Sequence, residues 1–329
     1  MDENHKILLL NRISSSDTSE QIKLLEDVTK IVQTIQLERY NVKDQYTINR
    51  LHDSNLLYQK AYLHGLSILK LSKGIPVEMP KFNTVVSLND PVSIAILVRG
   101  LLETYLTFYH INFTDDDDKR ETSYISWIVF GLKQRLKLKF EKPDENLIIT
   151  HREIYDKYNQ MYIYNMQRLE EEKRVLENYI EALKRTTVFS SFDLETQRNY
   201  IKQLSREWKF EYSDNKYQPI GYQDIFNRVG IRLSSFSNLY NHLSWPTHST
   251  SVAMSQIADM WNQGRMDVLF LNNSLIYTNL FLSLMSRDIL VNDPDFMIGY
   301  NELSQEKRDL LNFYNYYYRG NDFTIDRIE

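Results

Sequence analysis

The sequence predicts an all-α protein, built as a multi-helix bundle with one long helix and helical additions at both ends. Glycine (9) and proline (7) are scarce among the 329 residues, whereas sheet proteins need many turn residues. Apolar residues recur at helical spacing through most of the chain. The 42% hydrophobic and 25% charged residues are typical of a globular protein with a sizeable core.

The composition also excludes several classes of protein. There is no cysteine, which excludes disulfides, thiolate zinc sites and thiol nucleophiles and favours a reducing, cytoplasmic location. The formal charge of −5 gives no overall attraction to nucleic acid or to an anionic membrane. The N-terminus is acidic before its short apolar run, unlike a secretory signal. Two apolar segments, 91–113 and 266–290, are interrupted by polar side chains, so we expect buried helices there and no membrane partner.

The first half of the chain predicts four helices, at 19–36, 52–71, 91–113 and 123–140. Ser16 and Asp17 precede the first as plausible caps, and Pro91 occupies the first position of the third, where its missing N–H is not needed. Residues 74–89 show no periodicity and contain prolines, which predicts a loop.

In the second half, residues 146–186 predict either one helix of about 40 residues or two helices with a kink. Apolar stripes lie at its two ends, at Ile154, Tyr158 and Met161 and at Leu176, Ile180 and Leu183. The polar middle favours an arm that packs at both ends, and an ordinary long helix is the alternative. Further helices are expected at 194–209, 231–243, 246–261 and 266–290, with a short hairpin in the segment WKFEYSDNKYQPIGY.

The chain has no internal repeat and no low-complexity linker. We therefore expect a helical pair at 1–80 packed on a main bundle at 90–300, followed by an aromatic tail at 301–329. The tail crowds Phe313, Tyr314, Tyr316, Tyr317 and Tyr318 into six residues. These rings cannot all face one core, because six helical residues exceed one turn. We expect a homodimer or larger homo-oligomer through the tail or the bundle face beside it, and the alternative is that the tail folds back across its own bundle.

One polar constellation interrupts the apolar segment 91–113. Arg99 and Glu103 are four residues apart and share a helix face. We expect both to be mostly buried, either as an internal ion pair or as part of a polar pocket. A second segment, SSFSNLYNHLSWPTHSTS, carries Tyr240 and Ser244 on one face and His248 after the break at Pro246. Histidine beside hydroxyls at a helix break is suited to acid–base chemistry.

These residues resemble a known pattern. An Arg-x3-Glu helix followed by Tyr-x2-Leu-Ser-x3-His resembles an uncharacterised bacterial all-helical family placed near the HEPN superfamily, matched here at Arg99, Glu103, Tyr240, Leu243, Ser244 and His248. The resemblance covers about residues 90–290. It implies either a metal-independent ribonuclease, often dimeric and used in stress or phage defence, or a binding module of the same fold. The Arg-x4–6-His motif of active members is missing, because no arginine lies four to six residues before His242 or His248.

If the chain cleaves RNA, the 2′-hydroxyl of the RNA attacks the phosphate. In that reaction His248 serves as acid or base and Arg99 stabilises the phosphorane, with Glu103, Tyr240 and Ser244 around them. The basic stretch Lys133, Arg135, Lys137 and Lys139 would hold phosphates, or is a solvated helix face. We expect no metal and no cofactor, because metalloprotease, di-iron, phosphate-loop and nucleophile-elbow motifs are all missing. The run of four aspartates in FTDDDDKRE suits a helix N-terminus better than a metal site.

Overall fold

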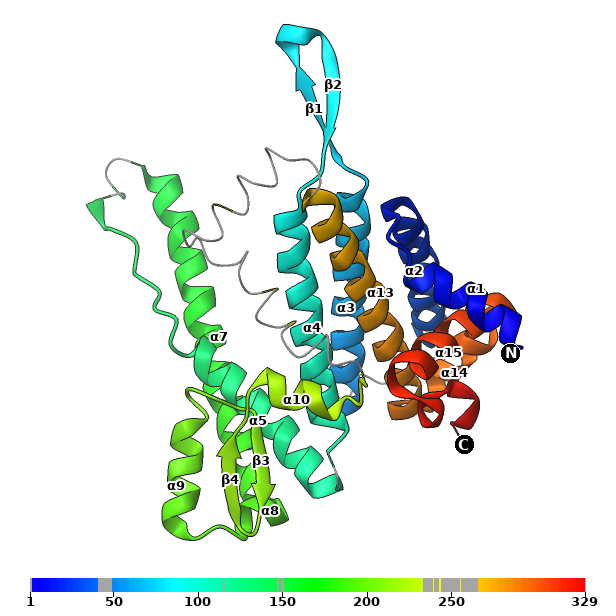
Figure 1. Cartoon of the computed structure of the whole chain (residues 1–329). Helices are drawn as coiled ribbons and strands as arrows, with labels where there is room; N and C mark the ends of the chain where they lie inside the picture. Colours follow the sequence, from blue (N-terminus) through cyan, green and yellow to red (C-terminus); the bar gives the residue numbers. More distant parts are fainter. Residues whose placement is uncertain are drawn as a thin grey trace. The chain divides into compact units, whose positions relative to one another are not determined.

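The computed structural model describes residues 2–40, 49–114, 116–146, 148, 151–232, 239, 243, 255 and 266–328. Helices dominate this part of the chain (Figure 1), and its strands form only two short antiparallel pairs. The prediction of an all-α multi-helix bundle is therefore confirmed.

The chain packs as two compact units. One consists of Met1–Tyr109 and Tyr222–Glu329, and the other of His110–Gly221. The predicted segments 1–80 and 301–329 both belong to the first unit, whereas the predicted segment 90–300 contributes to both units.

The first unit is organised around one core helix. Its helices are α1 (Glu3–Ile13), α2 (Thr18–Tyr40), α3 (Arg50–Ser72), most of α4 (Pro91–Asn112), α10 (Tyr222–Arg228), α13 (Met266–Asn292), α14 (Met297–Asn301) and α15 (Gln305–Arg319), with short 3-10 turns at Pro294–Phe296, Asn321–Phe323 and Ile325–Arg327. Helix α13 packs against α2, α3 and α15 (Figure 1). Helix α13 is apolar on nearly every side, and a helix of this kind is stable only when other helices surround it. This explains why the sequence of α13 has the composition of a membrane span.

A β-hairpin replaces the loop expected at 74–89. Strands β1 (Ile75–Met79) and β2 (Thr84–Leu88) pair antiparallel, joined by a 3-10 turn at Pro80–Phe82. Asn83 closes this turn at φ 45°, a left-handed conformation that asparagine tolerates better than most residues. The two prolines do not prevent the hairpin. Pro80 lies in the turn, where no strand hydrogen bond is needed. Pro76 lies in β1, and each strand of a two-stranded ribbon has one unpaired edge, where a proline is tolerated. The hairpin projects away from the helices around it (Figure 1).

The aromatic tail folds back onto its own unit, which was the alternative to an interface. Phe313, Tyr314 and Tyr318 are buried, and α15 packs against α13, α2 and α1. Tyr316 and Tyr317 remain exposed, so the five rings do not all face the core. Deleting the tail would therefore remove part of the core of this unit.

The second unit has an aromatic core. Its elements are α5 (Asp117–Arg135), α7 (Arg152–Arg185), α8 (Thr187–Ser190), α9 (Leu194–Gln203), β3 (Phe210–Ser213) and β4 (Lys216–Pro219). The buried Tyr200 hydroxyl lies 2.6 Å from that of Ser126 and 2.7 Å from that of Tyr212. The predicted hairpin is confirmed, and its two-residue turn uses Asp214 and Asn215 at positive φ.

Helix α7 is continuous from Arg152 to Arg185. Its C-terminal end packs against α5 and α8, and Leu183 is fully buried. Ile154, Tyr158 and Met161, near the other end, are exposed. The arm was expected to pack at both ends, and within the described residues only the C-terminal end does.

Several predicted boundaries are also too long. Helix α5 ends at Arg135 rather than at residue 140, and α9 ends at Gln203 rather than at residue 209. Both errors come from extending an apolar pattern past a turn. The helices predicted at 231–243 and 246–261 lie almost wholly outside the described residues.

Two helices in the described chain, Pro91–Asn112 and the stretch Val268–Asn292 of α13, are long and apolar enough to cross a membrane. Most of each is buried against the protein itself, which is the environment expected for core helices.

Candidate functional site

The Arg99–Glu103 pair lies on the surface side of α4. Arg99 Nε is 3.0 Å from Glu103 Oε1, and the two side chains are 21% and 33% exposed. Most of the surface of both side chains is therefore covered, as expected, although neither is sealed from solvent. An ion pair that keeps contact with water avoids most of the desolvation that a fully buried pair must overcome.

The apolar side chains of α4 lie in two environments. Val98, Leu101, Leu102 and Tyr105 are buried, whereas Ile96 is 42% exposed. The helix thus has a core face and a surface face that are both largely apolar in sequence. Composition alone does not tell which of the two faces carries the charges.

The second half of the predicted site, Tyr240, Ser244 and His248, lies outside the described residues. Within that segment only Leu239 and Leu243 are described, and both are buried. The approach of Arg99 and His248 to a common phosphate therefore stays a prediction.

His64 on α3 is a candidate that the sequence argument missed. It packs against Gly100 of α4, where an added Cβ would lie 3.1 Å from the imidazole Cε1. Its Nε2 is shielded from solvent and has no hydrogen-bond partner among the described residues. Burial, with the nearby Lys60, lowers the pKa of His64 below its ordinary value of 6.5.

His64 thus places a titratable imidazole against Gly100, the residue that follows Arg99 in the sequence of α4. The available signal in the sequence was Gly100, because a glycine in the middle of a helix often marks a close approach by a neighbouring element.

Most residues of the predicted phosphate-binding stretch make hydrogen bonds or ion pairs within the second unit. Lys133 Nζ donates to the Ile201 carbonyl, and Lys137 Nζ donates to the Ser205 carbonyl at 2.8 Å. Both cations therefore satisfy carbonyls at the C-terminal end of α9, where backbone acceptors lack helical partners. Burial lowers the pKa of Lys133.

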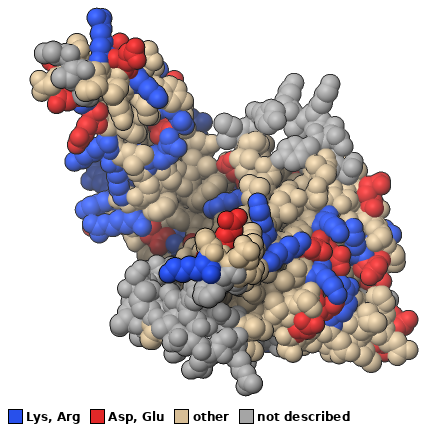
Figure 2. All heavy atoms as spheres, turned by 90° about the horizontal axis from the view of Figure 1, so that it is seen from above, with Lys and Arg blue, Asp and Glu red and all other residues tan. Residues whose placement is uncertain are grey.

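The other two members of that stretch differ from each other. Arg135 forms an ion pair of 2.7 Å with Glu172 of α7, and Lys139 is exposed. Figure 2 shows lysine and arginine side chains interspersed with acidic ones on the visible face. Only Lys139 of the four has no described structural role.

The aspartate run caps helices. Asp116 accepts the backbone N–H of Lys119 at the start of α5, and Asp118 accepts those of Thr187 and Val188 at 2.9 and 2.7 Å. Carboxylates at helix N-termini are favoured by the helix dipole. Among the described residues, no three histidine or acidic side chains lie together in a way that could hold a metal ion.

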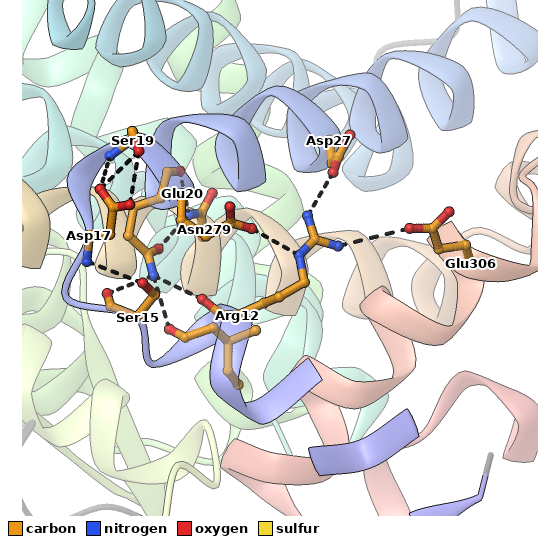
Figure 3. Close-up of polar contacts among 10 residues, drawn as sticks. Arg12, Ser15, Asp17, Ser19, Glu20, Asp27, Asn279 and Glu306 are labelled. Atoms are coloured by element: carbon orange, nitrogen blue, oxygen red, sulfur yellow. Dashed lines mark hydrogen bonds and ion pairs between the residues drawn. The ribbon is translucent and has the colours of Figure 1, made fainter. Parts of the chain in front are cut away.

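A polar cluster joins α1, α2 and α15 around Arg12 (Figure 3). The guanidinium lies 3.1 Å from Glu20, 3.1 Å from Asp27 and 3.9 Å from Glu306. Burial lowers the pKa of Arg12, but its hydrogen bonds to Asp27 and Glu20 outweigh burial and raise it overall. Three carboxylates already neutralise this cation, so the cluster holds helices together rather than offering a site for an anion.

A second missed cluster lies in the core of the first unit. Arg319 Nη1 is 2.8 Å from Asp288 Oδ1, the Tyr105 hydroxyl donates to Asp288 Oδ2 at 2.8 Å, and Arg319 Nε donates to the Val229 carbonyl at 2.8 Å. Arg319 and Asp288 are 1% and 0% exposed. A network so fully sealed stabilises the fold and has no route for a substrate.

The electrostatics of this cluster follow from its burial. Burial by itself lowers the pKa of Arg319. The interactions of its guanidinium, above all with Asp288, raise the pKa by more than burial lowers it, so the group stays charged. Burial also raises the pKa of Tyr105 well above its ordinary value, which keeps its hydroxyl protonated and able to donate to Asp288. Asp288 could have revealed this cluster from the sequence, because it is a charged residue near the end of the apolar segment 266–290.

Comparison with known proteins gives no relative from which a function could be transferred. No protein-family model matches the chain, and no curated protein and no solved structure is significantly similar to it.

Proposed function

We propose that this protein is a helical interaction module that self-associates in the cytoplasm. The observation that carries the proposal is the exposed apolar stripe of α7. Ile154, Tyr158, Met161 and Tyr164 are 44%, 56%, 52% and 58% exposed. Exposed apolar side chains that form a continuous patch are typical of protein interaction sites.

The composition of the same stretch supports this function. Residues 158–167 read YNQMYIYNMQ and contain no charge, although charged residues flank them on both sides. Tyrosine and methionine are enriched at the centres of protein interfaces, where lysine and glutamate are depleted. A solvated helix surface with no binding role normally shows the opposite composition.

Sedimentation velocity over a concentration series tests the proposal. The wild-type protein should sediment above the mass of the 39.4 kDa chain at micromolar concentration, and Met161→Glu should shift it toward the monomer. Leu194→Glu is a matched control, because Leu194 is 73% exposed at the start of α9 and lies outside the stripe. A monomer at every concentration in the wild-type protein would refute self-association.

A metal-independent endoribonuclease of HEPN-like character is the second candidate, and the position of His64 favours it. Histidine transfers protons near neutral pH, and an arginine stabilises charge on a phosphorane. His64 and Arg99 lie on adjoining helices, in contact through Gly100. His248 remains the predicted partner in the same reaction.

The test is cleavage of single-stranded RNA in EDTA by purified protein. Cyclic phosphate ends are expected, together with loss of cutting in both His64→Ala and Arg99→Ala. His151→Ala, at an exposed position before α7, should cut like the wild-type protein. Cleavage that survives both His64→Ala and His248→Ala would exclude this site.

A further inference from the structure

The exposed stripe of α7 is symmetric along the helix. Its four members follow each other at intervals of four, three and three residues, so they lie on one side of a helix with 3.6 residues per turn. Ile154 and Tyr164 are each five residues from position 159. Tyr158 and Met161 straddle nearly the same centre. A stripe with this symmetry matches a copy of itself running in the opposite direction.

Antiparallel pairing of two α7 helices about residue 159 would form two kinds of layer, each layer being a pair of side chains that pack against each other across the two helices. Ile154 would pack against Tyr164 of the second copy at both ends, and Tyr158 would pack against Met161 of the second copy in the middle. The layers extend from residue 154 to residue 164, or about 15 Å along the helix. A parallel arrangement would instead place each tyrosine against its own copy.

The charges beside the stripe are complementary in the same arrangement. Glu153 and Arg168 are fifteen residues apart, which puts them about 60° apart around the helix, both within about 40° of Tyr164 at one edge of the stripe. In antiparallel pairs, matching flanks of the two helices face each other. Reflection through residue 159 brings Arg168 level with residue 150 of the second copy, about 4–5 Å along the axis from Glu153. Both side chains are long enough to span that offset.

The contacts made within one chain leave both groups available. Arg168 lies 3.9 Å from Glu172 and 5.9 Å from the ring of Tyr164, and its side chain is 48% exposed. Glu153 is exposed and forms no ion pair with another residue that the structure describes. An exposed pair at 3.9 Å contributes little energy, so Arg168 exchanges partners at small cost.

We infer that two copies of this chain associate through α7 in an antiparallel pair, with Ile154–Tyr164 and Tyr158–Met161 layers flanked by two Glu153–Arg168 ion pairs. The inference rests on the proposed function and names its partner as a second copy of this chain. The short contact predicts a dimer with a dissociation constant in the micromolar range, because small interfaces are typical of weak association.

Charge reversal tests the pairing directly. Glu153→Arg and Arg168→Glu should each weaken self-association at least tenfold, because each creates two like-charge contacts. An equimolar mixture of the two variants should associate as tightly as the wild-type protein, because every flank contact between unlike chains is then attractive. Glu181→Lys, far along α7 and paired only with Lys184 at 2.6 Å among the described residues, is the control and should behave like the wild-type protein.

A mixture as weak as the single variants would overturn the pairing. Unchanged association in both single variants would overturn it too, while leaving self-association through another surface intact. A wild-type protein that never associates would instead refute the proposed function itself. Circular dichroism of each variant separates these outcomes from misfolding.

The orientation has its own test, because the chain contains no cysteine. Oxidation of an equimolar mixture of Ile154→Cys and Tyr164→Cys should yield disulfides between unlike chains, since these positions face each other only in the antiparallel register. Disulfides between like chains would show a parallel pair and contradict the inference.

Discussion

The Asp288 carboxylate on α13 and the Arg319 guanidinium at the end of α15 form an ion pair of 2.8 Å that is sealed from solvent. The pair ties the last long helix to the core helix of the first unit, and Arg319 also stacks on Phe323 at 4.1 Å. A buried pair of this kind depends on both of its members, because either one alone is a buried charge without compensation.

Replacing Arg319 with methionine should therefore lower the free energy of unfolding by about 3–5 kcal/mol. Urea denaturation followed by circular dichroism measures the change. Arg327→Met is the matched control, because Arg327 is 55% exposed in its pair with Asp322, and it should cost less than about 1 kcal/mol. A small effect at Arg319 would mean that Asp288 does not depend on it.

Gly299 and Gly131 provide a contrasting pair of glycine substitutions. An added Cβ at Gly299 would lie 2.7 Å from Ile35 Cα and 2.7 Å from the Thr34 carbonyl, whereas nothing lies within 4 Å of the same position at Gly131. Gly299→Ala should destabilise by about 1–3 kcal/mol, because backbone atoms must move. Gly131→Ala, in the interior of α5, should stabilise by about 0.5–1 kcal/mol. Thermal melts of the two variants should shift in opposite directions.

Arg99→Ala should destabilise the protein less than Arg319→Met does, because the Arg99 and Glu103 side chains are 21% and 33% exposed and their ion pair keeps contact with water. A buried pair would cost about 3–5 kcal/mol, so the melting temperature distinguishes the two environments. A loss as large as that of Arg319→Met would place Arg99 in a sealed pocket after all.

His64 should make the protein less stable in mild acid. Burial holds its pKa below the ordinary 6.5, so the unfolded chain binds the proton more tightly than the folded chain does. The free energy of unfolding therefore falls as the pH is lowered below 6.5 toward the folded-state pKa of His64. Chemical denaturation at neutral and mildly acidic pH measures this slope.

His64→Gln should flatten that slope, because it removes the group whose proton affinity differs between the two states. His151→Gln keeps His64 and should retain the wild-type slope. An unchanged slope in His64→Gln would assign the acid sensitivity to another group.

The sequence by itself determined the fold class and most of the helices. Scarce glycine and proline with apolar residues at helical spacing are sufficient for that inference, because helix formation depends on local pattern and few breakers. The second hairpin was also predictable, since Asp214–Asn215 is a short-range turn signal between strand-like residues.

Only the tertiary structure decided which apolar faces are covered. Tyr158 and Tyr314 look alike in sequence, yet one is 56% exposed on α7 and the other 1% exposed on the buried face of α15. Burial depends on which distant elements pack together, and no local pattern encodes that. The same reason explains why Arg99–Glu103 lies near the surface while Asp288 pairs with Arg319 in the core. Each of these charges interrupts an apolar helix, and its environment is set by residues far away in the chain.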